Sequence, residues 1–196
     1  MSENEQNRAG FSQLHSAGRL KKTVVMVGMM GAGKTAVGRA LAARLGVPFL
    51  DSDAEIEAAA NMSVPEIFTR DGEPFFRFKE SQVIRRLLEE ECCVLSTGGG
   101  AFLAVENREM ISRRGVSVWL KADLDVLWNR VRHKDTRPLL QTDDPYETLR
   151  GLCQARVPLY AKADLAVISD GHTPIERMVD RVLAVLATRP DVLELD

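Results

Sequence analysis

The sequence has few cysteines, and those few exclude two ways of building a small protein. The three are Cys92, Cys93 and Cys153. Two of them are adjacent, the number is odd, and no further ligands stand at metal-binding spacing, so neither a disulfide framework nor a zinc site organises the fold. We expect all three to be buried thiols in a reducing compartment.

Long apolar runs and an excess of one charge are also lacking. No stretch approaches the roughly 18 to 20 apolar residues that span a bilayer, and no cationic segment followed by an apolar one opens the chain. Glu3 and Glu5 argue against an organelle transit peptide, which is poor in acids. The 28 acidic and 26 basic residues give a net charge of −2, unlike a general nucleic-acid binder. We expect a cytoplasmic protein without membrane or nucleic-acid partners.

The composition indicates one folded domain between two loose ends. The 196 residues are 45% hydrophobic and 28% charged, which is typical of a soluble globular chain with a single core. Residues 1–20 are polar and lack periodicity, so we predict a disordered tail there. The domain is predicted over 21–188, and 189–196 is predicted to be a second loose end.

Short apolar runs alternate with helical patterns, which predicts an α/β fold: a five-stranded parallel sheet flanked by helices. All five strands are expected to be buried on both faces. The polar segment 133–144 interrupts the alternation and predicts a small mobile lid. Predicted strands are 23–27, 48–50, 93–96, 116–120 and 165–168, and predicted helices are 34–45, 53–60, 64–71, 74–90, 105–114, 124–132, 145–160 and 174–187.

Residues 28–35 read Gly-Met-Met-Gly-Ala-Gly-Lys-Thr, between the first predicted strand and the first predicted helix. This is the phosphate-loop (P-loop) pattern, in which backbone N–H groups and a lysine hold a triphosphate and the hydroxyl binds Mg²⁺. The alternative is a plain glycine-rich turn, but Lys34 and Thr35 in register favour nucleotide binding. The predicted ATP-binding residues here are Gly31, Ala32, Gly33, Lys34, Thr35 and Ala36.

The nucleotide class follows from two missing motifs. No glycine has an aspartate three residues before it, as a GTPase switch requires. The segment 161–164 has a weak likeness to a guanine-binding motif, but it precedes a predicted strand instead of following it. We therefore predict ATP and not GTP.

Two carboxylates, Asp51 and Asp53, follow the second predicted strand directly. Ligands of open parallel sheets bind at the carboxyl ends of strands, so the pair could divide its work between Mg²⁺ and a substrate hydroxyl. The alternative is that Ser52 or Asp53 only caps the next helix. The two roles are compatible for Asp53.

Six segments together resemble the shikimate kinase family, a branch of the nucleoside-monophosphate-kinase-like P-loop enzymes. They occur in the family's order within about residues 22–186. The resemblance implies ATP-dependent phosphorylation of the 3-hydroxyl of shikimate, with Mg²⁺, on the route to chorismate and the aromatic amino acids. Ala36 departs from many relatives, which carry a second hydroxyl there. The segments are 28–35, Phe-Leu-Asp-Ser-Asp at 49–53, Gly-Glu-Pro-Phe-Phe-Arg-Phe-Lys-Glu at 72–80, Ser-Thr-Gly-Gly-Gly-Ala at 96–101, Arg-Pro-Leu-Leu at 137–140 and Arg-Val-Pro-Leu-Tyr at 156–160.

The resemblance also assigns the substrate site. Arg77 and Arg156 would bind the shikimate carboxylate, since guanidinium and carboxylate pair in a bidentate manner. Asp53 would hold the hydroxyls and orient or deprotonate the attacking one, and Asp51 would bind Mg²⁺ through water. Glu80 either braces Arg77 or forms an ordinary surface ion pair with it. The turn Gly98, Gly99 and Gly100 would line the pocket.

Three further roles complete the predicted site. Arg137, in the predicted lid, would neutralise the transferring phosphoryl group, so Lys34, Asp53 and Arg137 form the catalytic set. Arg130 would stack on adenine, with Arg132 as the competing choice, and the loop 169–174 would complete the adenine site.

Two other functions remain open. A different small-molecule kinase, such as a gluconate kinase, shares the loop but does not need the two arginines and three glycines. A noncatalytic ATP-binding module would be expected to lose Lys34, Asp53 or Arg137, and all three are present. We expect a monomer.

Overall fold

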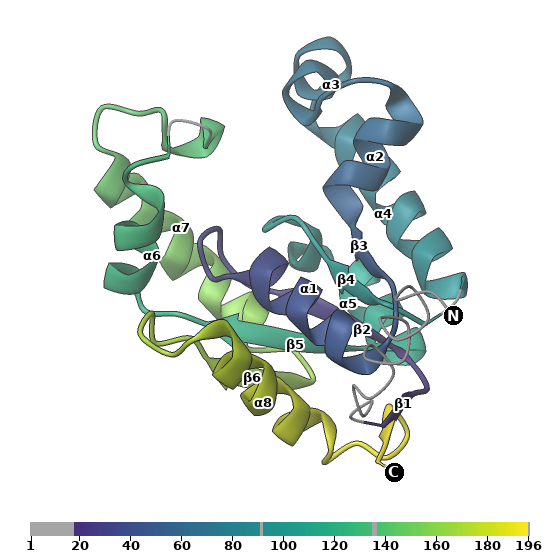
Figure 1. Cartoon of the computed structure of the whole chain (residues 1–196). Helices are drawn as coiled ribbons and strands as arrows, with labels where there is room; N and C mark the ends of the chain where they lie inside the picture. The colour runs from purple at the N-terminus through teal and green to yellow at the C-terminus, as the bar shows by residue number, and fades with distance from the viewer. Residues whose placement is uncertain (1–17, 91, 135–136, 196) are drawn as a thin grey trace, which may run out of the picture.

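The computed structural model describes residues 18–90, 92–134 and 137–195, and within them the predicted parallel sheet is confirmed (Figure 1). The strand order is β3-β4-β2-β5-β6, with every pair parallel. The strands are β2 (Thr23–Val27), β3 (Phe49–Asp51), β4 (Val94–Ser96), β5 (Gly115–Lys121) and β6 (Leu165–Ile168).

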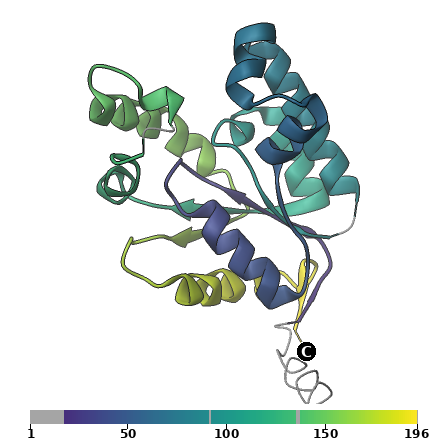
Figure 2. The ribbon, with the colours of Figure 1, turned by 45° about the horizontal axis from the view of Figure 1, so that its top comes forward.

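Helices cover both faces of this sheet. Figure 2 shows α1 and α8 side by side on one face, and the remaining helices lie beyond the other face in two groups. None of the helices in the described ranges is long and apolar enough to cross a membrane. The helices are α1 (Lys34–Leu45), α2 (Ser52–Ala60), α3 (Val64–Asp71), α4 (Glu73–Glu89), α5 (Val105–Arg114), α6 (Leu124–Val131), α7 (Pro145–Tyr160) and α8 (Ile175–Leu186), with 3-10 turns η1 (Ala101–Leu103) and η2 (Pro138–Leu140).

The central strands are the buried ones. Every residue of β2 is buried, as is expected of a parallel strand between two layers of helices. The prediction that all five strands are buried on both faces is wrong for the two edges. β3 is only half-buried, and Ile168 at the end of β6 is 65% exposed, because an edge strand has a neighbour on one side only.

The two chain segments that flank the domain form a second, smaller sheet. β1 (Arg19–Leu20) pairs antiparallel with β7 (Leu193–Glu194), and Leu20, Val192 and Leu193 belong to the core. The predicted loose end is therefore wrong over 189–195, and the predicted tail at 1–20 is too long by at least Arg19 and Leu20. Two-residue strands form few hydrogen bonds, but the burial of these apolar side chains stabilises the pairing. Residues 1–17 lie outside the described residues.

The cysteines differ in burial. Cys93, which precedes β4, is buried, whereas Cys92 and Cys153 are half-buried. The expectation of three buried thiols is thus correct for Cys93 alone. Cys153 lies on α7, whose outer face meets solvent.

Candidate active site

All the predicted site residues except Arg77, Gly100 and Arg156 line one cavity at the carboxyl ends of β2, β3 and β4. Strand ends on one edge of a parallel sheet carry their loops to the same place, which explains why segments far apart in sequence meet here. In Figure 1 the loop before α1 lies between two raised groups of helices, α2–α4 and α6–α7, and the cavity is lined by that loop, the start of α2, the end of α6 and the start of α8. The volume is about 540 Å³, and the lining includes Gly31, Ala32, Gly33, Lys34, Thr35, Ala36, Asp51, Asp53, Gly98, Gly99, Arg130 and Arg137.

The P-loop has the backbone that its glycines allow. Gly31 and Gly33 have φ of 81° and 97°, a left-handed conformation that favours glycine. A Cβ at Gly31 would stand 2.8 Å from a methyl group of Val131, so α6 packs directly against the loop. The curl leaves the start of α1 facing the cavity, where backbone N–H groups attract anions.

Lys34 lies folded under the loop. Its Nζ donates to the carbonyl oxygens of Gly28 at 2.7 Å and Met29 at 2.9 Å. Burial, and then the nearby charge of Arg137, lower the pKa of Lys34 from 10.5 to about 8. An anion such as a triphosphate would satisfy this buried cation.

Asp51 and Asp53 take different positions after β3. Asp51 is the N-cap of α2: its Oδ1 accepts from the backbone N–H of Asp53 at 2.9 Å and of Ala54 at 3.2 Å. The alternative that Ser52 or Asp53 caps the helix is therefore wrong, because the cap falls one residue earlier. Asp53 lies in the first turn of α2 with its side chain at the cavity.

Asp53 stands between the two halves of the site. Burial, and then the negative charge of Asp51, raise the pKa of the Asp53 carboxyl, while Arg77 and Lys34 oppose that rise. Its Oδ1 is buried without a hydrogen-bond partner among the described residues. A buried acceptor of this kind needs a donor, and a substrate hydroxyl would supply one.

Oxygen ligands for a divalent cation are present in the cavity. Thr35 offers a hydroxyl and Asp51 the carboxylate oxygen that does not cap α2, and both line the same cavity. Hard oxygen donors fit Mg²⁺, which keeps several waters and is usually held by one or two protein groups together with phosphates. Residues 18–90, 92–134 and 137–195 contain no cluster of three His, Cys, Asp or Glu side chains that could form a site of protein ligands alone.

Each glycine of the turn at 98–100 faces a different predicted substrate-binding side chain. A Cβ at Gly98 would stand 2.9 Å from Oδ1 of Asp53, and one at Gly99 would stand 3.1 Å from Nη1 of Arg156. A Cβ at Gly100 would stand 2.6 Å from Cζ of Arg77. Side chains larger than hydrogen would therefore displace these three groups, which is why three consecutive glycines occur here.

Arg77 is held by two carboxylates of its own helix. Nη1 pairs with Oε2 of Glu80 at 2.8 Å and Nη2 pairs with Oε1 of Glu73 at 3.4 Å. Glu80 is only 1% exposed, so of the two interpretations of this pair the surface one is wrong and the bracing one fits. Burial raises the pKa of Glu80, and its hydrogen bond with Arg77 opposes that rise. A second cavity, of about 330 Å³, adjoins Arg77, Gly100 and Arg156.

Arg156 has a different partner, which the sequence analysis did not single out. The Tyr160 hydroxyl donates to the carbonyl oxygen of Gly99 at 2.5 Å, and a Cβ on Gly99 would stand 3.5 Å from this hydroxyl and 3.1 Å from Nη1 of Arg156, so both groups border the same glycine. Burial raises the pKa of Tyr160, and Arg156 opposes that rise. The spacing of four residues on α7, which places both side chains on one helix face, is the sequence signal that could have identified Tyr160.

Arg130, and not Arg132, faces the nucleotide end of the cavity. Its Nη1 donates to the carbonyl oxygen of Gly31 at 2.8 Å and lies 3.4 Å from Oγ of Ser169. Arg132 is exposed and bonds to its neighbour His133 instead. The stacking of Arg130 on adenine stays a prediction, and the structure limits the choice to this arginine.

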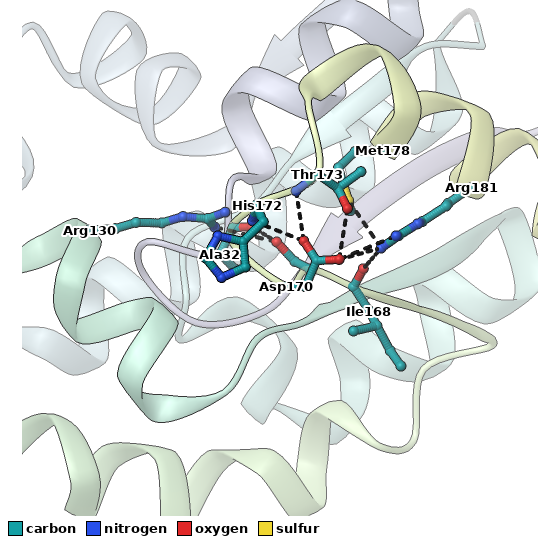
Figure 3. A network of polar contacts seen from close by, with 9 residues as sticks. Ala32, Arg130, Ile168, Asp170, His172, Thr173, Met178 and Arg181 are labelled. Atoms are coloured by element: carbon teal, nitrogen blue, oxygen red, sulfur yellow. Dashed lines mark hydrogen bonds and ion pairs between the residues drawn. The ribbon is translucent and has the colours of Figure 1, made fainter.

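Figure 3 shows how the loop after β6 is held beside Arg130. Asp170 accepts hydrogen bonds from the Thr173 hydroxyl at 2.7 Å and the Thr173 backbone N–H at 2.8 Å, and it pairs with Arg181 at 3.2 Å. These bonds hold the pKa of the Asp170 carboxyl well below its usual range. The ordered loop brings Ser169 and Thr173 to the cavity. Met178 of α8 also lines the cavity, and the sequence analysis did not identify this residue.

Arg137 reaches the cavity from the predicted lid. It is half-buried, and its Nε is buried without a partner among the described residues. Its charge acts on Lys34, so both cations face the same space. Leu140, three residues further on, is buried and its N–H bonds to the Arg137 carbonyl oxygen at 2.9 Å. Residues 135–136 of the lid lie outside the described residues.

Comparison with known proteins gives this arrangement a family. The shikimate kinase family model matches residues 30–187. Shikimate kinase of Ruegeria pomeroyi is 79% identical over 179 residues, which cover 91% of this chain and 92% of the relative. The chain belongs to the shikimate kinase family. Shikimate kinase of Cereibacter sphaeroides is 72% identical, over 91% of this chain and 89% of the relative.

Solved structures of the shikimate kinase family share the fold. Shikimate kinase from Acinetobacter baumannii in complex with shikimate aligns with a TM-score of 0.80 and 38% identity, over 86% of this chain and 94% of that chain. A gluconokinase from Sinorhizobium meliloti aligns with a TM-score of 0.57 and 21% identity, over 87% of this chain and 94% of that chain, which shows a common fold alone. The predicted P-loop kinase fold is confirmed.

Proposed function

We propose that this protein is a shikimate kinase, which transfers the γ-phosphoryl group of ATP to the 3-hydroxyl of shikimate and releases ADP and shikimate 3-phosphate. The observation that carries the proposal is the place of Asp53. Its carboxyl lines the cavity of Lys34 and lies against Gly98, the first glycine of the turn that reaches the acid pocket, which is the second cavity beside Arg77, Gly100 and Arg156. Asp53 is thus the potential base between the site of the phosphoryl donor and the site of the acceptor.

The acid pocket orients the acceptor. Arg77 and Arg156 bind the carboxylate of the substrate, and their positions against Gly100 and Gly99 fix the ring. Asp53 accepts a hydrogen bond from the hydroxyl that attacks and takes its proton as the new P–O bond forms. The raised pKa of this carboxyl makes it a better proton acceptor than an ordinary aspartate.

The P-loop side binds the donor and stabilises the charge that moves. The N–H groups before α1, together with Lys34, hold the triphosphate, and Arg130 with the loop 169–174 encloses the base. Arg137 neutralises charge on the phosphoryl oxygens during transfer. Thr35 and Asp51 would hold Mg²⁺, directly and through water respectively, and the ion would supply Lewis-acid stabilisation of the phosphate oxygens when bound.

The deciding experiment measures ADP release over a panel of hydroxylated carboxylates that includes shikimate and gluconate, each with ATP and Mg²⁺. We expect turnover with shikimate alone. Turnover with gluconate instead would assign the chain to another branch of these kinases. ADP release with no acid of the panel, together with a melting temperature that rises with ATP alone, would support a noncatalytic ATP-binding module.

Two coarser features belong to the same proposal. The site is built from elements of one chain, so we propose that a monomer suffices, acting in the cytoplasm. Light scattering at assay concentration is expected to give the mass of a single chain. A dimer as the active species would contradict this part of the proposal and leave the chemistry untouched.

A further inference from the structure

Tyr160 is a buried phenol at the meeting point of three elements. It is the last residue of α7, it is fully buried, and its ring centroid lies 6.3 Å from that of Trp119 in β5. Its hydroxyl donates to Gly99, in the turn after β4, and lies beside the same glycine as Nη1 of Arg156, which stands four residues earlier on its own helix. Because the single proton of the phenol goes to Gly99, its oxygen keeps lone pairs free to accept, and the neighbouring guanidinium of Arg156 can only donate.

We propose that Tyr160 is a positioning residue that holds Arg156 and the glycine turn in the geometry that receives the substrate carboxylate. The inference rests on the proposed function, because it concerns how one arginine of that site is oriented. None of the roles described above accounts for the orientation of Arg156. Tyr160 itself is too deeply buried to contact a ligand, so it acts through Arg156 and Gly99.

The two arginines of the acid pocket differ in what orients them. Arg77 is neutralised by Glu73 and Glu80. In the described part of the chain no carboxylate lies within ion-pair distance of Arg156. A neutral hydroxyl orients a guanidinium without cancelling its charge, so the full positive charge of Arg156 stays available for the substrate. A free arginine side chain has many rotamers, and fixing it in advance saves part of the entropy that binding would otherwise cost.

The ring of Tyr160 packs near Trp119, and this contact does not involve the hydroxyl. Trp119 pairs with Val27 in the sheet, and a Cβ at Gly28 would stand 3.4 Å from Cδ1 of Trp119. Gly28 starts the P-loop, and its carbonyl oxygen accepts from Lys34. The ring thus supports the P-loop through Trp119, whereas the hydroxyl serves the acid pocket. Removing the hydroxyl alone should therefore weaken shikimate binding and spare ATP binding.

The test compares Tyr160→Phe with the wild type in steady-state kinetics. The variant keeps the ring and loses only the hydroxyl. We expect KM for shikimate to rise about tenfold, as the loss of one or two hydrogen bonds to a charged group predicts, with kcat and KM for ATP within about twofold. The matched control is Tyr146→Phe, which removes the other hydroxyl of the chain's two tyrosines from the same helix and should leave all three constants unchanged.

A double-mutant cycle with Arg156→Ala separates positioning from general support of the fold. Since Tyr160 acts in part through Arg156, Tyr160→Phe should raise KM for shikimate by a clearly smaller factor in the Arg156→Ala background than in the wild type. An equal tenfold rise in both backgrounds overturns the inference, as does an equal rise of KM for shikimate and for ATP.

Melting temperatures with shikimate alone distinguish this inference from the proposed function. A wild type that shows neither a shift with shikimate nor ADP release overturns both. A wild type that responds and a Tyr160→Phe variant that responds equally at the same shikimate concentrations overturn the inference alone.

Discussion

Gly100 lies against the guanidinium of Arg77, so closely that a Cβ on this glycine would stand 2.5 Å from Nη1. Arg77 cannot move aside freely, because Glu73 and Glu80 hold it from its own helix. Glycine at position 100 therefore leaves the space that the guanidinium of Arg77 occupies.

Gly100→Ala should raise KM for shikimate by at least tenfold, because the methyl group displaces the guanidinium, while KM for ATP stays within about twofold. Steady-state kinetics with each substrate varied in turn checks this. Gly151→Ala is the matched control: Gly151 lies in α7 with no atom near its missing Cβ, so the variant should keep both constants and gain about 0.5–1 kcal/mol of stability. An unchanged KM for shikimate in Gly100→Ala would show that Arg77 does not depend on this contact.

Asp53→Asn should reduce kcat by about 10² or more, since it removes the proposed proton acceptor. The same change should raise the melting temperature at neutral pH. Burial and Asp51 both disfavour the charged form of Asp53, so its raised pKa means that stability falls as pH rises through that pKa, and the neutral amide does not incur this loss. Calorimetry of wild type and variant at matched pH measures it. A variant that is both inactive and less stable would indicate a structural role instead.

The pKa of about 8 at Lys34 predicts the alkaline side of the pH profile. The protonated form binds the triphosphate, and it is lost as pH rises through that value, so kcat/KM for ATP should fall above about pH 8. The profile of kcat/KM reports the free enzyme, in which no phosphate yet opposes deprotonation. Lys134→Ala removes the other lysine that lines the cavity and should keep the alkaline limb. A flat profile up to pH 9.5 would contradict a lowered pKa at Lys34.

Leu193→Ala should lower the free energy of unfolding by about 2–4 kcal/mol, as truncation of a buried leucine commonly does. Leu193 is 2% exposed and belongs to β7, on the far side of the molecule from the cavity. Activity at 25 °C should therefore be unchanged. Leu195→Ala is the control, since Leu195 is 59% exposed, and it should be neutral. Chemical denaturation measures both. Equal stability of the two variants would show that β7 contributes little.

The local signals in the sequence were enough to predict the main elements and most of the residues that line the cavity. The strand 23–27, the helix 34–45 and the helix 145–160 have the predicted bounds, because the apolar period and the turn residues of each lie within the element itself. The P-loop and the glycine turn at 98–100 could be found for the same reason.

What the sequence could not supply depends on contacts between distant segments. The pairing of Leu20 with Leu193 joins residues at opposite ends of the chain, and two-residue strands carry no periodicity. The exposure of Ile168 follows from its place at the sheet edge, which an apolar run does not reveal. The burial of Glu80 depends on how α4 packs, and a charge three residues from Arg77 has the same pattern on a surface as in a core.

The small sheet of β1 and β7 has a consequence for synthesis on the ribosome. β7 is the last strand along the chain and pairs with β1, the first, so this pairing must wait until all the elements between them have been made and β7 has left the exit tunnel. Until then Leu20 and its core neighbours lack their cover, although every strand of the large sheet has already been made. The large sheet, whose strand ends carry the active site, can thus form before β1 and β7 pair.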